Sequence, residues 1–188
     1  MKKVTFFAAL LLTSATAFAQ NWTNDKAHSK LAFTVTHLML SEVDGSFRKF
    51  DVKMTSSKDD YSDAQIDLTA DVNSIDTNEE KRDGHLKSAD FFDAAKHPTL
   101  TFKSTGIQKL GGNKYKLMGN LTMHGVTKPV TLDATITPAT THPMNKKTVA
   151  GFKVSGEVKR ADFTLGTIPA AVVSDEIGIR AGGELVKN

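Results

Sequence analysis

Apolar and polar residues alternate one by one along most of this chain, and this pattern limits its fold more than any other feature. In residues 30–38, Leu31, Phe33, Val35 and His37 share one face of an extended segment, and small or polar residues share the other. Successive side chains of a strand point to opposite faces, so alternation with period two indicates a strand that buries one face. Similar patterns occur in residues 45–54, 65–72, 99–107, 115–123, 130–137, 150–158 and 177–181.

These eight segments and the short turns between them predict an all-β domain. Residues 45–54 are less regular, because Phe47 and Phe50 fall out of phase, and this indicates a bulge or a bend. Strands at this spacing favour an antiparallel sandwich or barrel, and the pattern alone does not separate the two. Closure into a barrel would remove exposed strand edges, and an eight-stranded barrel is wide enough to hold one elongated ligand.

Residues 79–92, EEKRDGHLKSADFF, do not follow the strand pattern. Residues 77–80 read TNEE and fit a capping box, which predicts a helix with Thr77 as its N-cap and Gly84 ending or kinking its first turn. We expect a short helical connection after the third or fourth strand. It would close one side or end of the barrel and turn its two phenylalanines inward.

The same connection carries Arg82, Asp83 and His85, which are residue types of a general-base site. The sequence holds no Gly-x-Ser-x-Gly elbow, no Ser-x-x-Lys and no cysteine to supply a nucleophile. An Arg beside an Asp at a helix end more often binds backbone, so we predict that Arg82 and Asp83 fix the closure. We predict no catalytic residue, no enzyme activity and no cofactor.

The histidines give no sign of a metal site. None of the six shows His-x-His or His-Glu-x-x-His spacing, so we predict no metal. The lysines are scattered among acids without interleaved aromatic residues, so we predict no nucleic-acid partner.

The first residues have the features of an export signal. Lys2 and Lys3 precede an apolar run at residues 4–12, and residues 17–19 read AFA, a small-x-small cleavage site. We interpret residues 1–19 as a signal peptide and residues 20–188 as a single domain without an integral membrane segment. The absence of cysteine excludes disulfides and argues against a lipid anchor after Ala19, so we expect a soluble mature protein beyond the inner membrane, either periplasmic or secreted.

Several motifs occur in order over nearly the whole chain. They include His28-Ser29-x-x-x-Phe33-x-Val35-x-His37, Gly45-x-Phe47, Ser74-Ile75-Asp76-Thr77, Arg82-Asp83-x-His85-Leu86, Pro98-x-x-Thr101-Phe102, Gly125-Val126-Thr127-Lys128-Pro129-Val130 and Arg160-x-Asp162-Phe163. Together these motifs resemble the YceI-like family. One departure is Thr164, at a position where the family pattern usually has glycine.

The resemblance implies an extended, lipocalin-like antiparallel barrel whose apolar lumen takes a polyisoprenoid or similar long-chain amphiphile, for which an isoprenoid quinone is one candidate. Our leading hypothesis is a periplasmic carrier or buffer of such a lipid. Two alternative functions stay open: an enzyme or accessory factor acting on the lipid, and a stress-induced interaction protein. The sequence also leaves open whether the protein is a monomer or a dimer. The predicted ligand-binding residues are Leu31, Phe33, Val35, His37, Phe47, Phe91, Phe92, Phe102, Leu121 and Phe152.

Overall fold

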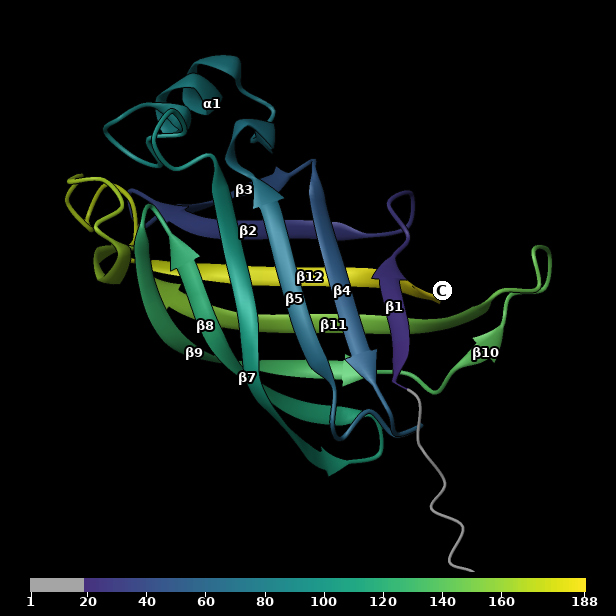
Figure 1. Cartoon of the computed structure of the whole chain (residues 1–188). Helices are drawn as coiled ribbons and strands as arrows, with labels where there is room; N and C mark the ends of the chain where they lie inside the picture. Colours follow the sequence, from purple (N-terminus) through teal and green to yellow (C-terminus); the bar gives the residue numbers. More distant parts are fainter. Residues whose placement is uncertain (1–18) are drawn as a thin grey trace, which may run out of the picture.

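One antiparallel sheet closes on itself into a barrel in the computed structural model, which describes residues 19–188 (Figure 1). The predicted signal peptide lies almost wholly outside these residues and stays a prediction. The strands are β1 (Gln20–Asn24), β2 (Lys30–His37), β3 (Ser41–Phe47), β4 (Phe50–Ser56), β5 (Gln65–Asp71), β6 (Ile75–Asp76), β7 (Thr99–Gly111), β8 (Lys114–Met123), β9 (Val126–Ile136), β10 (Thr140–Thr141), β11 (Thr148–Lys159) and β12 (Glu176–Lys187).

Strand β12 closes the barrel by pairing on both of its sides. It pairs with β11 along its length, and on its other edge with β1 near one end and β2 near the other. β1 and β2 thus act as one long interrupted strand, and β3 and β4 as one strand bent at residues 48–49. Counted this way, eight antiparallel strands form the barrel, which confirms the predicted fold class.

The bend between β3 and β4 explains the irregular alternation of residues 45–54. Phe47 ends β3 and Phe50 begins β4, and both side chains are buried. Beyond the bend the alternation is regular, with Val52 and Met54 buried and Lys53 exposed. Each wall strand thus presents apolar residues to the interior and polar residues to water, as one-sided burial of an antiparallel sheet requires.

The barrel has one closed end, formed by the connection from β4 to β5. Tyr61 in this connection is 2% exposed and lies edge-on to Trp22, with ring centroids 5.9 Å apart. The two rings fill the interior between β1 and the β4–β5 connection, so the cavity described below stops short of this end.

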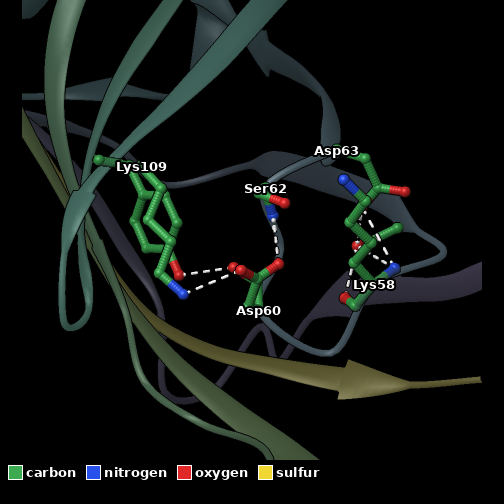
Figure 2. Close-up of polar contacts among 7 residues, drawn as sticks. Lys58, Asp60, Ser62, Asp63 and Lys109 are labelled. Carbon is green, nitrogen blue, oxygen red and sulfur yellow. Dashed lines mark hydrogen bonds and ion pairs between the residues drawn. The ribbon is translucent and has the colours of Figure 1, made fainter.

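A polar network holds the closed end in place (Figure 2). The Asp60 carboxylate accepts hydrogen bonds from the Ser62 amide at 3.1 Å and from Lys109 Nζ at 3.0 Å. Tyr115 donates its hydroxyl proton to the Asp60 carbonyl at 2.8 Å. The hydrogen bond from Lys109 is the main reason that the pKa of Asp60 falls to about 2, and those from Ser62 add to it.

Asp63 gathers a second set of hydrogen bonds in the same connection. Its carboxylate accepts from the Ser56 hydroxyl at 2.6 Å and from the Ser57 amide at 3.0 Å. The Ser56 hydroxyl, followed by that of Ser57, holds the Asp63 pKa well below its usual range. Both carboxylates therefore stabilise this connection in their ionised form.

The opposite end is covered by helix α1 (Glu80–Lys87) and the chain that follows it, as Figure 1 shows. This connection lies between β5 and β7, after the third composite strand, as predicted. Two details of the prediction were wrong. Glu79, rather than Thr77, is the N-cap and accepts from the Lys81 and Arg82 amides, because Thr77 is buried and bonded elsewhere. The helix also continues through Gly84 to its C-cap, Ser88.

Two 3₁₀ helices complete the part of the fold in residues 19–188, η1 (Val72–Ser74) after β5 and η2 (Arg160–Phe163) after β11. None of the helices in residues 19–188 has the length and apolar character needed to cross a membrane.

Candidate functional site

A single elongated lumen, with a cavity volume of about 370 Å³, occupies the barrel interior between the closed end and α1. Side chains from strands all round the barrel line it, together with the α1 connection and residues 165–173. Almost all are aliphatic or aromatic, and no described carboxylate lines it. Its polar lining residues are His37, Thr77, Arg82, His85 and Arg160.

All ten residues predicted to bind a ligand line this lumen. Leu31, Phe47 and Phe102 are buried in the wall, whereas Phe33 and Val35 are half-buried and retain free surface toward the cavity. The sequence therefore located the lumen correctly, and that these side chains contact a ligand stays a prediction. The remaining members of the predicted set are His37, Phe91, Phe92, Leu121 and Phe152.

Other lining residues were not in the predicted set. Leu132, Ala134, Ile177 and Ile179 lie on strands whose alternation was recognised, so their period-two positions could have identified them. Residues 165–173 have no such period, and only their apolar composition hints at burial. Their contribution to the lumen depends on how the loop folds back onto the barrel.

Aromatic rings in contact with one another connect the barrel wall to the covering connection. Phe47 lies at the centre, with its ring centroid 5.9 Å from Phe33 and 6.1 Å from Phe92. The Phe47–Phe92 pair is edge-on, at 88°, a favourable geometry for aromatic rings. As predicted, Phe91 and Phe92 turn inward, and each is 6% exposed.

Glycine at Gly45 lets the Phe33 ring lie directly across the neighbouring strand. The two residues are paired between β2 and β3, and a Cβ at Gly45 would lie 2.2 Å from the Phe33 ring. Gly119 does the same for Phe102, where a Cβ would lie 2.3 Å from the ring. Both rings lean along the wall, which leaves the middle of the lumen open.

Thr77 anchors the covering connection. The Asp83 carboxylate accepts from the Thr77 amide at 2.8 Å and from its hydroxyl at 2.6 Å. Arg82 donates through Nε to the Thr77 hydroxyl at 2.8 Å and through a terminal nitrogen to the Thr77 carbonyl at 2.9 Å. Thr77 is only 4% exposed, so these bonds are partly shielded from water. The bonds tie the start of α1 to Thr77, which agrees with the predicted role of Arg82 and Asp83 in fixing the closure, and that role stays a prediction.

His85 does not join this cluster. Its Nε2 lies 3.7 Å from an Asp90 carboxylate oxygen, and its ring packs edge-on against Phe91 at 5.0 Å. Arg82 and Asp83 are directed to Thr77, so the three residues do not converge on one point as a general-base site requires.

Arg160 organises a second segment at the same end of the barrel as α1, the loop of residues 165–173. Its guanidinium is buried, with 6% of the residue exposed, and it donates to four backbone carbonyls. These are Leu165 at 3.0 Å, Gly166 at 3.0 Å, Ile168 at 2.7 Å and Val173 at 3.3 Å. The carbonyl dipoles replace the water that the charged guanidinium loses on burial. The same hydrogen bonds hold residues 165–173 against the barrel.

The end of this loop is bonded to the end of β2. The Leu38 amide donates to the Val172 carbonyl at 2.9 Å, and His37 forms an isolated bridge with Val173. Residues 37–40, residues 77–98 and residues 165–173 therefore surround the end that α1 covers, which we call the mouth. Four of the five polar lining side chains, all except Arg160, come from the first two of these segments.

One group of possible metal ligands occurs among the described residues. Asp25, His28 and Glu184 place one ligand atom each within 4.8 Å of one another, beside the β1–β2 connection and outside the lumen. His28 Nδ1 lies 3.2 Å from the Asp25 carboxylate, and this hydrogen bond raises the pKa of His28. The ion pair accounts for the grouping.

Comparison with solved structures identifies the same architecture in other proteins. BcnA of Burkholderia cenocepacia aligns with a TM-score of 0.77 and 27% identity, covering 86% of this chain and 98% of BcnA. The Campylobacter jejuni YCEI protein aligns with a TM-score of 0.74 and 31% identity, covering 81% and 90%. A polyisoprenoid-binding domain of Saccharophagus degradans shares the fold at 15% identity, with a TM-score of 0.67 and coverage of 89% and 98%.

Sequence comparison agrees with the structural one. Protein YceI of Salmonella agona is 40% identical over 163 residues, which are 86% of this chain and 84% of the relative. The YceI-like domain matches residues 22–185, from within β1 to within β12. The barrel, its lumen and these matches together show that the chain belongs to the YceI-like family.

Proposed function

We propose that this protein binds a polyisoprenoid or a similar long-chain amphiphile, with the apolar tail inside the lumen. The observation that carries this proposal is the lumen itself, which is enclosed by apolar side chains and has polar groups gathered at its mouth. Its volume lies within the roughly 300–1,000 Å³ common for small-molecule sites. Burial of a hydrocarbon chain contributes about 25 cal/mol per Å² before the costs of binding are subtracted.

The ligand class has support from one structural relative. The Saccharophagus degradans domain of the same fold is described as polyisoprenoid-binding. Because the identity is only 15%, this relative suggests a class of ligand and does not indicate which residues of this chain bind it. The chemical argument therefore rests on the residues that line the lumen of this chain. An unbranched or isoprenoid chain matches a narrow, nearly uncharged interior. An isoprenoid quinone belongs to the same class.

The polar lining residues suggest the orientation of the ligand. His37, Arg82 and His85 line the mouth, whereas Met54 and Leu117 line the deep part near the closed end. A polar head would therefore lie at the mouth, where the Arg82 guanidinium and two imidazoles can donate hydrogen bonds. The tail would extend along Phe33 and Val35 toward the closed end.

The proposal is for binding rather than catalysis. Arg82 and Asp83 both bond Thr77, so their role in the closure accounts for their presence. With the predicted signal peptide, we infer a periplasmic carrier or buffer that shields the lipid tail from water.

A variant that fills the lumen tests the proposal. Val154 on β11 lines the lumen between Ala134 and Ala181 on the neighbouring strands, so Val154→Trp would place an indole in the free space. Ser155→Trp is the matched control, because the next residue is exposed on the outer face. Each protein is isolated from its own cells without detergent and examined by native mass spectrometry with added polyprenyl probes.

The wild type and Ser155→Trp should retain a lipid-sized mass or take up the probe. Val154→Trp should lose at least about tenfold in occupancy, because removing contact with even a few buried methylene groups costs more than 1.4 kcal/mol. If all three proteins are empty and reject the probes, or bind them equally, lumen binding is excluded.

A further inference from the structure

Four large apolar side chains are exposed together at the mouth. Leu38 is 47% exposed, Met39 76% and Leu40 85%, in the turn between β2 and β3, and Val172 of the adjoining loop is 37% exposed. We call these four residues the apolar tip. Within residues 19–188 the other large apolar side chains with comparable exposure are Leu110 and Met144, which lie on the β7–β8 and β10–β11 hairpins.

The turn that carries Leu38, Met39 and Leu40 has a backbone conformation that these residue types disfavour. Leu38 has φ 53° and Met39 φ 55°, and the Leu40 amide donates to the His37 carbonyl at 3.0 Å. Two left-handed residues inside such a turn define type I′, which strongly prefers Asn-Gly. Leucine and methionine in this conformation cost roughly 1 kcal/mol each. The turn therefore exposes apolar side chains to water and also strains the backbone, and both lower the stability of the fold. Such a cost is typical of a site that makes a contact outside the chain.

The apolar tip is continuous with the lumen. Leu38 bonds Val172 through the backbone, and Val172 lines the lumen together with its neighbour Val173. On the strand side, Val35 and Val43 line the lumen just below the turn. An apolar path thus runs from the exposed turn into the cavity.

We propose that the apolar tip docks the mouth onto a lipid bilayer by inserting its aliphatic side chains between the headgroups. A lipid tail could then pass between bilayer and lumen along apolar surface instead of through water. This inference rests on the proposed function and adds where the ligand is exchanged and which residues make that contact.

The chemistry of the apolar tip favours a bilayer over a protein partner. A stable protein interface buries about 800 Å² per partner and is anchored by aromatic or Arg residues. The apolar tip offers four aliphatic side chains on one narrow turn and one loop, which is too little for such an interface. Interfacial membrane binding scales with the apolar area that enters the headgroup region, and one acyl chain already gives weak, reversible binding, so a few aliphatic side chains suit a reversible bilayer contact.

Charge contributes little to this contact. The acidic residue Glu42 follows the turn, and Asp175 and Glu176 follow Val172, whereas the basic Lys81 and Arg82 lie on α1. Both signs therefore surround the mouth. The proposal predicts that binding depends on apolar insertion and changes little with salt or with the fraction of anionic lipid.

Vesicle flotation tests the proposal. The double variant Leu38→Asn/Met39→Gly installs the preferred type I′ pair and removes two apolar side chains. The control is Leu110→Asn/Met144→Ser, which removes two equally exposed apolar side chains elsewhere. All proteins are compared in the same processed form, verified at the N-terminus by mass spectrometry. Vesicles are phosphatidylcholine alone or mixed with an equal part of phosphatidylglycerol.

The wild type and the control should float with both kinds of vesicle. The affinity of the tip variant for the vesicles should be at least about tenfold lower. The tip variant should also resist urea better than the wild type, because its turn is unstrained, so reduced flotation cannot reflect unfolding. Equal flotation of wild type and tip variant, or no flotation of either, would overturn the proposal.

A separate measurement distinguishes this inference from the proposed function. In native mass spectrometry at equilibrium, the tip variant should fill its lumen with polyprenyl probe as completely as the wild type, because the lumen is unchanged. In transfer from vesicles, it should fill more slowly. If the lumen is empty in both proteins and the wild type still floats with vesicles, the proposed function is wrong and the docking proposal still stands.

Discussion

Thr164 shows how a single residue can reveal a backbone requirement. The family pattern usually has glycine there, and the structure gives the reason, because Thr164 is left-handed with φ 52° and ψ 33°. A β-branched residue in this region is a genuine outlier, so the turn after η2 keeps a conformation that its sequence disfavours. The Thr164 hydroxyl partly compensates by donating to the Phe163 carbonyl at 2.7 Å.

Replacing Thr164 by glycine should therefore stabilise the protein. We expect Thr164→Gly to raise the free energy of unfolding by about 1 kcal/mol, because it removes the left-handed strain. Thr164→Ala should give no gain, since it keeps Cβ and loses the hydroxyl. Urea unfolding of the three proteins measures this, and an equal gain from alanine would show that Cβ strain is not the cause.

At the scale of elements, the sequence predicted a segment of each of the eight composite strands but missed β1, and it predicted the details of the connections poorly. Strands such as β9 repeat a two-residue pattern that sequence alone displays, and the covering connection was located by its charges and paired phenylalanines. The cap of α1 was wrong because Thr77 is taken up by Asp83 and Arg82, contacts that depend on tertiary packing. The closed end and the loop of residues 165–173 were missed for the same reason.

The β4–β5 connection should make the closed end sensitive to acid. The pKa of Asp60 is lowered to about 2 by Lys109 and Ser62, against about 3.9 in an unfolded chain. Because the folded pKa is the lower one, its stabilisation is complete above about pH 4 and is lost as the pH falls toward 2. Asp63, whose pKa is also lowered, adds to the same trend.

The measurement is the urea midpoint between pH 5 and pH 2. It should fall less steeply in Asp60→Asn than in the wild type, because the variant has no such carboxylate to protonate. Asp67→Asn, an exposed change on β5, should keep the wild-type slope. If Asp60→Asn also keeps that slope, the carboxylate does not hold the closed end.

Arg160 should be the main support of the loop at the mouth. Arg160→Met removes a buried guanidinium that serves four carbonyls, and we expect a loss of about 3 kcal/mol in unfolding free energy. Arg180→Met, which removes an exposed ion pair with Asp44, should cost less than about 1 kcal/mol.

Hydrogen exchange shows whether this loss is local. In Arg160→Met, protection should fall first in residues 165–173, with the distant closed end less affected. Uniform loss of protection across the barrel would contradict the assigned role of Arg160.

At the scale of the whole molecule, the two ends of the barrel differ in structure. Trp22 and Tyr61 close one end of the barrel, and the covering connection and the Arg160 loop form the mouth at the other. Alternation could predict strands with one apolar face, but it left barrel and sandwich open, and the barrel was expected from the family resemblance alone. The sequence could not predict the free volume, which depends on how far rings such as Phe33 lean along the wall.

The most direct test of lipid binding is a crystal structure of the protein isolated from its own cells without detergent. We predict continuous, elongated density in the lumen, from His37 and Arg82 at the mouth toward Met54 and Leu117, with a matching amphiphile in the lipid extract. A lumen that is dry or filled only by ordered waters, in protein whose extract contains no amphiphile, would contradict the proposal.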